Sequence, residues 1–176
     1  MDEAGHLALR IAREAAARYL AAGIMIEPPP NLPSALQERA GVFVTIRQDS
    51  LLRGCVGTLR PTTPTVAHEI IANAIAAATA DPRFPAIHCA ELPELNFEVD
   101  ILCELEPVRD KSSLDPSLYG VVVEAESLNG VLLPRMEGVT TIDQQIEIAR
   151  AKAGIPSDAP LTLHRFAVTR YREELS

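Results

Sequence analysis

The sequence predicts an α+β domain built on a mainly antiparallel sheet flanked by helices. Predicted strands outnumber predicted helices, short turns join neighbouring strands, and the helical segments lie between the hairpins. The chain has 176 residues, of which 47% are hydrophobic and 23% are charged. This length and composition are those of one globular domain with a substantial core and argue against a disordered chain.

The first part of the chain predicts one helix, one connector and one hairpin. Ala4–Ala22 is rich in Ala, Leu, Arg and Glu with apolar residues four apart, which predicts an amphipathic helix ending near Gly23. The proline-rich segment Glu27–Pro33 predicts an extended connector, which is a lid or a rigid spacer, and the composition favours the spacer. Gly41–Arg47 and Leu51–Leu59 predict two strands joined by a turn.

The middle of the chain predicts a second helix followed by a strand. Two threonines precede Pro64, which predicts a capped helix that runs to about Ala80 and stops before an Asp-Pro pair. Apolar and polar residues alternate over residues 96–105. This alternation predicts a half-buried strand of an antiparallel sheet with Cys103 on its core side.

The last part of the chain predicts another hairpin, a helix and a final strand. Gly120–Glu126 and Val131–Leu133 flank Leu128–Gly130, whose Asn-Gly pair is a hairpin turn signal. A capping box that begins at Thr141 predicts the start of the last helix. Leu161–Tyr171 predicts a single closing strand.

Charge and cysteine usage argue against several classes of protein. The formal net charge of −8 argues against a nucleic-acid or anionic-membrane partner, because both attract clustered Lys and Arg. The chain starts without a basic leader, and no apolar run is long enough to span a bilayer. Three cysteines without Cys-x-x-Cys spacing argue against a disulfide framework or a zinc site. We therefore expect a cytoplasmic protein with reduced thiols and no metal.

The segment Leu51–Thr58 is the strongest candidate for a functional site. In a regular strand Arg53 and Cys55 share a face, so the guanidinium would favour a thiolate. Gly54 and Gly57 bracket the thiol, which predicts the close approach of a ligand or of another backbone. The alternative is that Cys55 is a small core residue, the glycines form a bulge, and Arg53 makes a salt bridge.

The turn at Asp81–Pro85 is the second candidate. A rigid turn could present Arg83 to an anionic ligand while Asp81 holds the guanidinium in place. The alternative is a helix stop with a local ion pair. We expect this turn to fold back beside the strand that carries Arg53 and Cys55, so that both segments line one cleft. The sequence does not show which histidine, if any, acts as a base for Cys55.

Leu52–Thr58 closely resembles the signature of the AmmeMemoRadiSam system protein A family, also called the AMMECR domain. The similarity runs from about Gly41 to the C-terminus through four further blocks, in order: Asp81–Phe84, Glu91–Leu95, Gly130–Pro134 and Lys152–Gly154. The resemblance implies a single domain over residues 1–176 with a larger and a smaller lobe, and a Cys-bearing signature that borders a cleft. It also implies that the gene lies beside genes for a radical SAM protein and a Memo-like protein. One departure is the absence of the tryptophan that many relatives carry after the Leu-Leu-Pro block.

Two functions remain open at this point. The first is an enzyme for a small anionic or nucleotide-like substrate, with Cys55 as nucleophile or redox thiol and with Arg53 and Arg83 as anion clamps. The second is a non-catalytic binding or scaffold module that serves the radical SAM and Memo-like partners. The sequence names no cofactor. The residues expected to contact a ligand are Arg53, Gly54, Gly57, Thr58, Asp81 and Arg83.

Overall fold

The computed structural model describes residues 1–174 and divides into two compact units. The first unit comprises residues 1–101 together with the segment from Thr169 onward, and the second unit comprises residues 102–168. Each unit contains one four-stranded sheet packed with helix. The strand pairs within these sheets include β1 with β2 and β3, and β5 with β6 and β7, and all of these pairs are antiparallel. The predicted α+β class is therefore confirmed.

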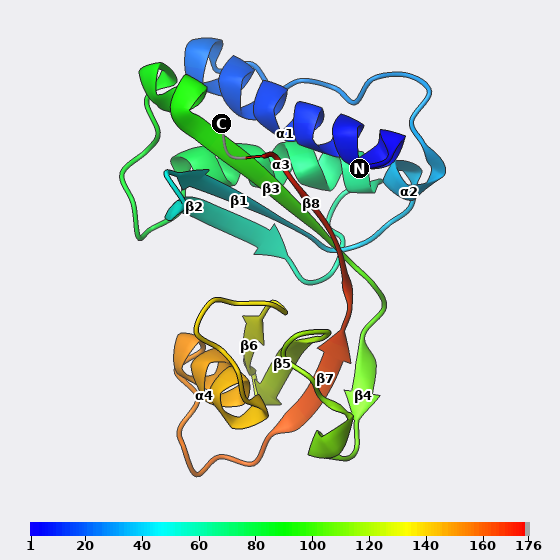
Figure 1. Cartoon of the computed structure of the whole chain (residues 1–176), viewed down its shortest axis with the longest axis vertical. Coiled ribbons are helices and arrows are strands. Elements are labelled where there is room, and N and C mark those ends of the chain that lie inside the picture. The colour runs from blue at the N-terminus through cyan, green and yellow to red at the C-terminus, as the bar shows by residue number, and fades with distance from the viewer. Residues whose placement is uncertain (175–176) are drawn as a thin grey trace. The chain divides into compact units, whose positions relative to one another are not determined.

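The first unit places two helices on one face of its sheet (Figure 1). The strand order is β2-β1-β3-β8. The strands are β1 (Val42–Gln48), β2 (Leu51–Thr58), β3 (Leu95–Leu102) and β8 (Val168–Arg172). The helices are α1 (Glu3–Ala22), the short α2 (Ser34–Gln37) and α3 (Val66–Thr79), followed by the 3-10 turn η1 (Cys89–Glu94).

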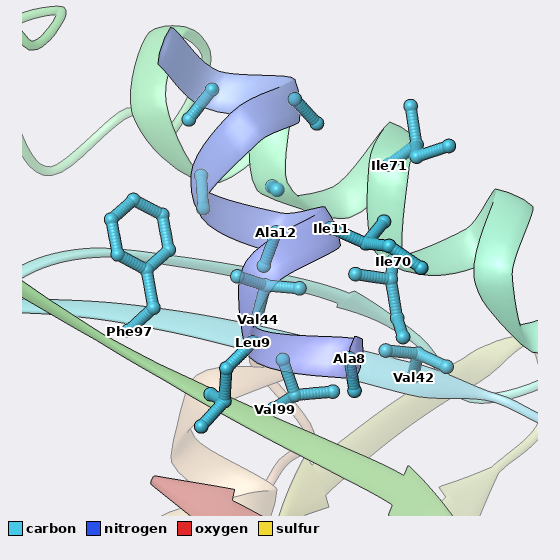
Figure 2. Packing of buried hydrophobic residues seen from close by; sticks show 14 of the residues in the cluster. Ala8, Leu9, Ile11, Ala12, Val42, Val44, Ile70, Ile71, Phe97 and Val99 are labelled. Atoms are coloured by element: carbon cyan, nitrogen blue, oxygen red, sulfur yellow. The ribbon is translucent and has the colours of Figure 1, made fainter. Parts of the chain in front are cut away.

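An aliphatic core fills the space between these helices and the sheet (Figure 2). Alanines such as Ala8 and Ala12 let α1 approach closely, and Val44, Val99 and Phe97 project from the strands beneath. Burying side chains of this kind stabilises the fold by about 1.5–3 kcal/mol for each large residue. The chain can therefore build a dense core although only 4% of its residues are aromatic.

The second unit has one helix against its sheet. The strand order is β4-β7-β5-β6, and α4 packs on β5 and β6. A separate aliphatic core lies between them. The elements are β4 (Glu106–Val108), the 3-10 turn η2 (Lys111–Ser113), β5 (Gly120–Ala125), β6 (Leu128–Leu132), α4 (Ile142–Lys152) and β7 (Thr162–Phe166).

The helix ends show how local signals set element boundaries. The Asp2 side chain caps α1, and Gly23 ends it in the left-handed region at φ 67°. The predicted capping box at the start of α4 is present, with Thr141 and Gln144 each bonding the other's backbone. Helix α3 begins two residues later than predicted, because the side chain of Thr65 is its N-cap. A short α2, which the sequence did not indicate, follows the proline-rich connector.

Strand β3 corrects the prediction of a half-buried strand. Cys103 lies beyond the end of β3 and is exposed, so its predicted place on the core side is wrong. Glu98 and Asp100, predicted to face solvent, are buried. The strand does have one apolar face and one polar face, as the alternation predicts, but the polar face is also buried. Its carboxylates are compensated by arginines of β8, as described below.

Two strand boundaries in the second half of the chain also differ from prediction. The β5–β6 turn is at Glu126 and Ser127, with Glu126 at φ 52°, and the Asn-Gly pair lies inside β6. Gly130 is required there because a Cβ would stand 1.9 Å from the Ala149 carbonyl oxygen. The predicted single strand over Leu161–Tyr171 is two strands, β7 and β8, that belong to different sheets.

Candidate functional site

A β-bulge in β2 sets the geometry of the signature segment. Cys55 pairs with Thr45 and Gly54 pairs with Ile46, but the next pair joins Arg47 to Leu52. Arg53 is therefore the extra residue of the bulge, and the regular alternation predicted to put it on the same face as Cys55 is interrupted. Cys55 and Gly57 keep the alternation, because they pair with Thr45 and Phe43 two residues apart.

Both glycines of the signature are explained by close packing. A Cβ on Gly54 would stand 2.2 Å from the carbonyl oxygen of Ala77, so α3 can approach β2 only at a glycine. A Cβ on Gly57 would stand 2.3 Å from the ring of Phe43. The expected approach of another backbone is thus found at Gly54. A ligand contact at either glycine stays a prediction.

The Asp81–Arg83 turn lies along the outer edge of β2. The backbone N–H of Cys55 donates to the Asp81 carboxylate at 2.8 Å, and Arg83 Nη2 donates to the Cys55 carbonyl at 3.3 Å. These two side chains bond the backbone of an edge strand as a neighbouring strand would. The predicted return of this turn to β2 is confirmed: the side chains of Asp81 and Arg83 bond the Cys55 backbone, and the Pro85 carbonyl accepts from Arg53. That the segments line a common cleft stays a prediction.

The Asp81–Arg83 pair is a nearly buried carboxylate joined to a half-exposed guanidinium. Arg83 donates from Nε at 2.9 Å and from Nη2 at 2.7 Å to the two carboxylate oxygens. Asp81 is 4% exposed, whereas the Arg83 side chain is 50% exposed. The hydrogen bond from Arg83, assisted by the Cys55 N–H, lowers the pKa of Asp81 to about 2. The same bond raises the pKa of Arg83, with smaller contributions from Cys55.

Arg53 is held by partners of its own. Its Nε and Nη2 donate to the two carboxylate oxygens of Glu91 at 2.9 and 3.1 Å, and its Nη1 donates to the Pro85 carbonyl at 2.8 Å. The bond from Arg53, followed by that from the His88 N–H, lowers the pKa of Glu91. Arg53 therefore ties the segment after α3 to β2, as the salt-bridge alternative foresaw, and its role as an anion clamp stays a prediction.

Thr58 anchors the loop that follows β2. Its hydroxyl donates to the Glu69 carboxylate at 3.1 Å. Glu69 is fully buried and also accepts from the backbone N–H groups of Thr62 and Thr63. A single carboxylate near the start of α3 thus fixes the chain between β2 and that helix. A ligand contact at Thr58 stays a prediction.

The thiol of Cys55 lies in a polar part of the sheet. The hydroxyl of Thr45 donates to Cys55 Sγ at 3.3 Å. In β3 the residue paired with Thr45 is Glu98. Arg170 on β8 donates to Asp100 at 2.7 Å and lies 3.3 Å from Glu98. From β2 to β8, the Cys55 thiol is therefore followed across the first sheet by the Thr45 hydroxyl, then by two buried carboxylates on β3, and then by Arg170.

Arg170 interacts electrostatically with the thiol as well as with these carboxylates. Burial lowers the pKa of Arg170, but the hydrogen bonds and charge of Asp100, with smaller contributions from Glu98 and Cys55, raise it overall. Nothing in the sequence pattern indicates that these residues lie together. A strand alternating Glu and Asp with apolar residues is typical of a solvated face, and only the pairing of β3 with β8 reverses that interpretation.

The other candidate groups serve local structure. His6 bonds the backbone of Asp2, His68 bonds Thr65, and His88 caps η1. His164 lies 3.7 Å from Glu124 in the second unit. Within residues 1–174, no three His, Cys, Asp or Glu side chains gather in an arrangement that would hold a metal ion. The site around Cys55 is therefore one of a thiol, hydroxyls, carboxylates and guanidinium groups.

Comparison with known proteins assigns the chain to a family. The AMMECR1 family model matches residues 9–176. The chain belongs to the AMMECR1 family. A Thermotoga maritima protein is 50% identical over 157 residues, which are 88% of this chain and 90% of that protein. A Thermococcus gammatolerans protein is 36% identical over 98% of this chain and 92% of its own length.

Two further matches bear on the fold and on domain context. The crystal structure of an uncharacterised Pyrococcus horikoshii protein matches with a TM-score of 0.92 and 31% identity, over 99% of this chain and 94% of that one. In a Clostridium acetobutylicum protein, 42% identical over 94% of this chain, the matched region is only 36% of the polypeptide. An AMMECR1-type region thus occurs within a longer chain. In the described part of the present chain, no helix has the length and apolar character needed to cross a bilayer.

Proposed function

We propose that the AMMECR1-type segment around Cys55 is a binding site for a small anionic or nucleotide-like ligand, in which Cys55 is the reactive thiol and Arg83 binds the anion. The observation that carries the proposal is the state of Arg83. Its Nε and Nη2 are fixed by Asp81 and by the Cys55 carbonyl, and its side chain is 50% exposed. An oriented, half-exposed guanidinium beside a thiol suits a carboxylate or a phosphate.

The proposed roles of the signature residues follow from their contacts. Arg53 is already bonded to Glu91 and to two backbone carbonyls, so its contribution is to hold the 85–91 segment in place. The backbone N–H of Cys55 donates to Asp81, and its carbonyl accepts from Arg83. These two bonds fix the position of the thiol. Within this proposal the protein is cytoplasmic and the thiol stays reduced, so that the thiolate acts as the nucleophile.

Alkylation by two reagents that differ in charge tests the proposal. Iodoacetate and iodoacetamide both react when a thiolate displaces iodide, but only iodoacetate carries a carboxylate. We expect the rate ratio of iodoacetate to iodoacetamide to be about fivefold higher at Cys55 than at the exposed Cys103, which serves as the control within the same molecule. High salt should reduce the difference. Arg83→Gln should remove it while thermal melting shows that the variant is folded. Equal ratios at the two cysteines would overturn the proposal.

A thermal-shift screen of carboxylates, phosphates and nucleotides then identifies the ligand. A ligand at a hundred times its dissociation constant stabilises the folded protein by about 2.7 kcal/mol, which is readily seen as a higher melting temperature. The stabilising compound should lose its effect in Arg83→Gln and keep it in Arg10→Gln. Arg10 is an exposed arginine of α1 without a hydrogen-bond partner in the described chain, so it is a matched control.

The second candidate function is a non-catalytic module that serves radical SAM and Memo-like proteins. Two observations favour it. The first is that packing or structural contacts account for four of the signature residues, namely Gly54, Gly57, Arg53 and Thr58. The second is that the matched region is part of a longer polypeptide in Clostridium acetobutylicum. Sedimentation of the purified protein with a radical SAM or Memo-like protein of the same organism tests it. A complex that survives Cys55→Ser and Arg83→Gln would favour the module, and no complex at micromolar concentration would count against it.

A further inference from the structure

Thr45 is a buried hydroxyl whose one hydrogen-bond partner is a thiol. It lies on β1 directly opposite Cys55 and is 4% exposed. Its Oγ1 is 3.3 Å from Cys55 Sγ, and no other partner of this hydroxyl occurs within residues 1–174. A buried hydroxyl without a good acceptor costs about 1–3 kcal/mol. A neutral thiol is a weak acceptor, whereas a thiolate is a strong one.

We infer that Thr45 is a positioning residue for Cys55, whose hydroxyl donates to the sulfur and stabilises the thiolate. The inference rests on the proposed function, because it concerns the thiolate on which that function depends. The bond strengthens when the thiol loses its proton to solvent, because the Thr45 hydroxyl then donates to a negatively charged sulfur. The hydroxyl keeps its own proton throughout, so it is neither an acid nor a base in the reaction.

The charged groups near this bond determine how much it contributes. Arg83 and Arg170 are both close enough to Cys55 for its charge to affect their pKa values. The carboxylates of Asp81, Glu98 and Asp100 oppose them, and each is paired with one of these arginines. The Thr45 hydroxyl is an uncharged donor to a sulfur that these arginines also affect, and its bond to the sulfur is stronger for the thiolate than for the thiol.

The β2 bulge creates this contact. The two-residue turn at Asp49 and Ser50 joins Gln48 to Leu51 as the first pair of the hairpin. A regular hairpin would then pair Thr45 with Gly54. The extra residue at Arg53 shifts the register by one, so that Thr45 meets Cys55. The bulge therefore places a hydroxyl opposite the thiol, which is a physical reason for an irregularity at this position.

The test is the pH dependence of Cys55 alkylation by iodoacetamide, a neutral reagent that does not depend on an anion site. In Thr45→Val, a close match in shape, we expect the midpoint of the rate profile to rise by about one pH unit. The rate at pH 7 should fall about threefold, because the lower thiolate fraction is partly offset by a more nucleophilic sulfur. Thr45→Ser keeps the hydroxyl and should restore the wild-type midpoint. Thr45→Ala provides a second variant without the hydroxyl, and Cys103 provides an unchanged internal profile.

The outcomes separate this inference from the proposed function. A wild-type midpoint in Thr45→Val or Thr45→Ala, with both variants folded by thermal melting, overturns the role of Thr45. Equal shifts in the Ser and Val variants also overturn it, because a methyl or packing effect would then be the cause. Neither result bears on the preference for iodoacetate, which depends on Arg83 and decides the proposed function independently.

Discussion

Two edge strands pack against a helix through a glycine. They are β2 in the first unit and β6 in the second. Gly54 of β2 faces the Ala77 carbonyl of α3, and Gly130 of β6 faces the Ala149 carbonyl of α4. The strands differ in what bonds their outer edges. β2 is bonded by the Asp81–Arg83 pair at Cys55, whereas β6 has a lysine, Lys152, that donates to the Val131 carbonyl at 3.2 Å.

This contrast indicates which part of the signature carries functional information. A glycine that admits a helix backbone is present in both units, so glycine alone is a packing feature in this fold. At β2, the backbone of a cysteine is bonded by a nearly buried carboxylate and its half-exposed arginine partner. The proposal for this protein therefore depends on Cys55, Asp81 and Arg83 more than on the glycines that make the motif recognisable.

The largest expected effect tests the close packing of a helix against a glycine in both units. Gly54→Ala and Gly130→Ala should each destabilise the fold by about 3 kcal/mol, because the added Cβ meets backbone that cannot move aside cheaply. Chemical denaturation measures the loss. Gly23→Ala is the control, since nothing lies near its Cβ and only its left-handed φ of 67° costs about 1 kcal/mol. A loss at Gly54 or Gly130 no greater than that at Gly23 would show that the helices can shift, and the comparison would fail.

The next effect separates the two edges. Asp81→Asn should cost about 2 kcal/mol, because Arg83 and the Cys55 N–H lose a charged acceptor that is nearly buried. Asp143→Asn in the second unit is the matched control. It breaks an exposed pair with Lys111 and should change the free energy of unfolding by less than about 0.5 kcal/mol. Similar losses in the two variants would contradict the structural importance of the β2 edge.

The same pair predicts how stability depends on pH. The pKa of Asp81 is about 2 in the folded protein and 3.8 in its ordinary state. Because the folded pKa is depressed, the stabilisation of about 2 kcal/mol is complete above about pH 4 and is lost as the pH falls through 2. Denaturation of the wild type and of Asp81→Asn over a pH series measures it. The difference between them should shrink below pH 4, and a constant difference down to pH 2 would rule out titration of Asp81 as its source.

The smallest effect concerns the bulge. Arg53→Lys should cost about 1 kcal/mol, because an ammonium cannot make the paired bonds to Glu91 and also reach the Pro85 carbonyl. Arg10→Lys, on an exposed part of α1, should cost nothing measurable. If Arg53→Lys keeps full stability but no longer binds a ligand found by thermal shift, Arg53 is an anion clamp and its role is not structural.

Local signals in the sequence were sufficient for much of the fold. Capping residues and a terminal glycine gave α1 and α4 to within one residue at most ends, because these signals act over a single helical turn. The AMMECR-type blocks and the alternation of β1, β2 and β3 gave the family and the antiparallel class. The charged, proline-containing turn also made Asp81 and Arg83 candidates, and the structure shows them bonded to the Cys55 backbone.

What the sequence left undetermined depends on partners distant along the chain. The bulge at Arg53 cannot be read from alternation, so the contact between Thr45 and Cys55 was out of reach. Glu98 and Asp100 resemble a solvated face until arginines seventy or more residues away pair with them. The sequence alone was thus sufficient for most of the helices and strands, for the family and for the segment of interest. The tertiary structure decided which side chains surround the thiol, because register and burial are properties of contacts between strands and not of any one strand.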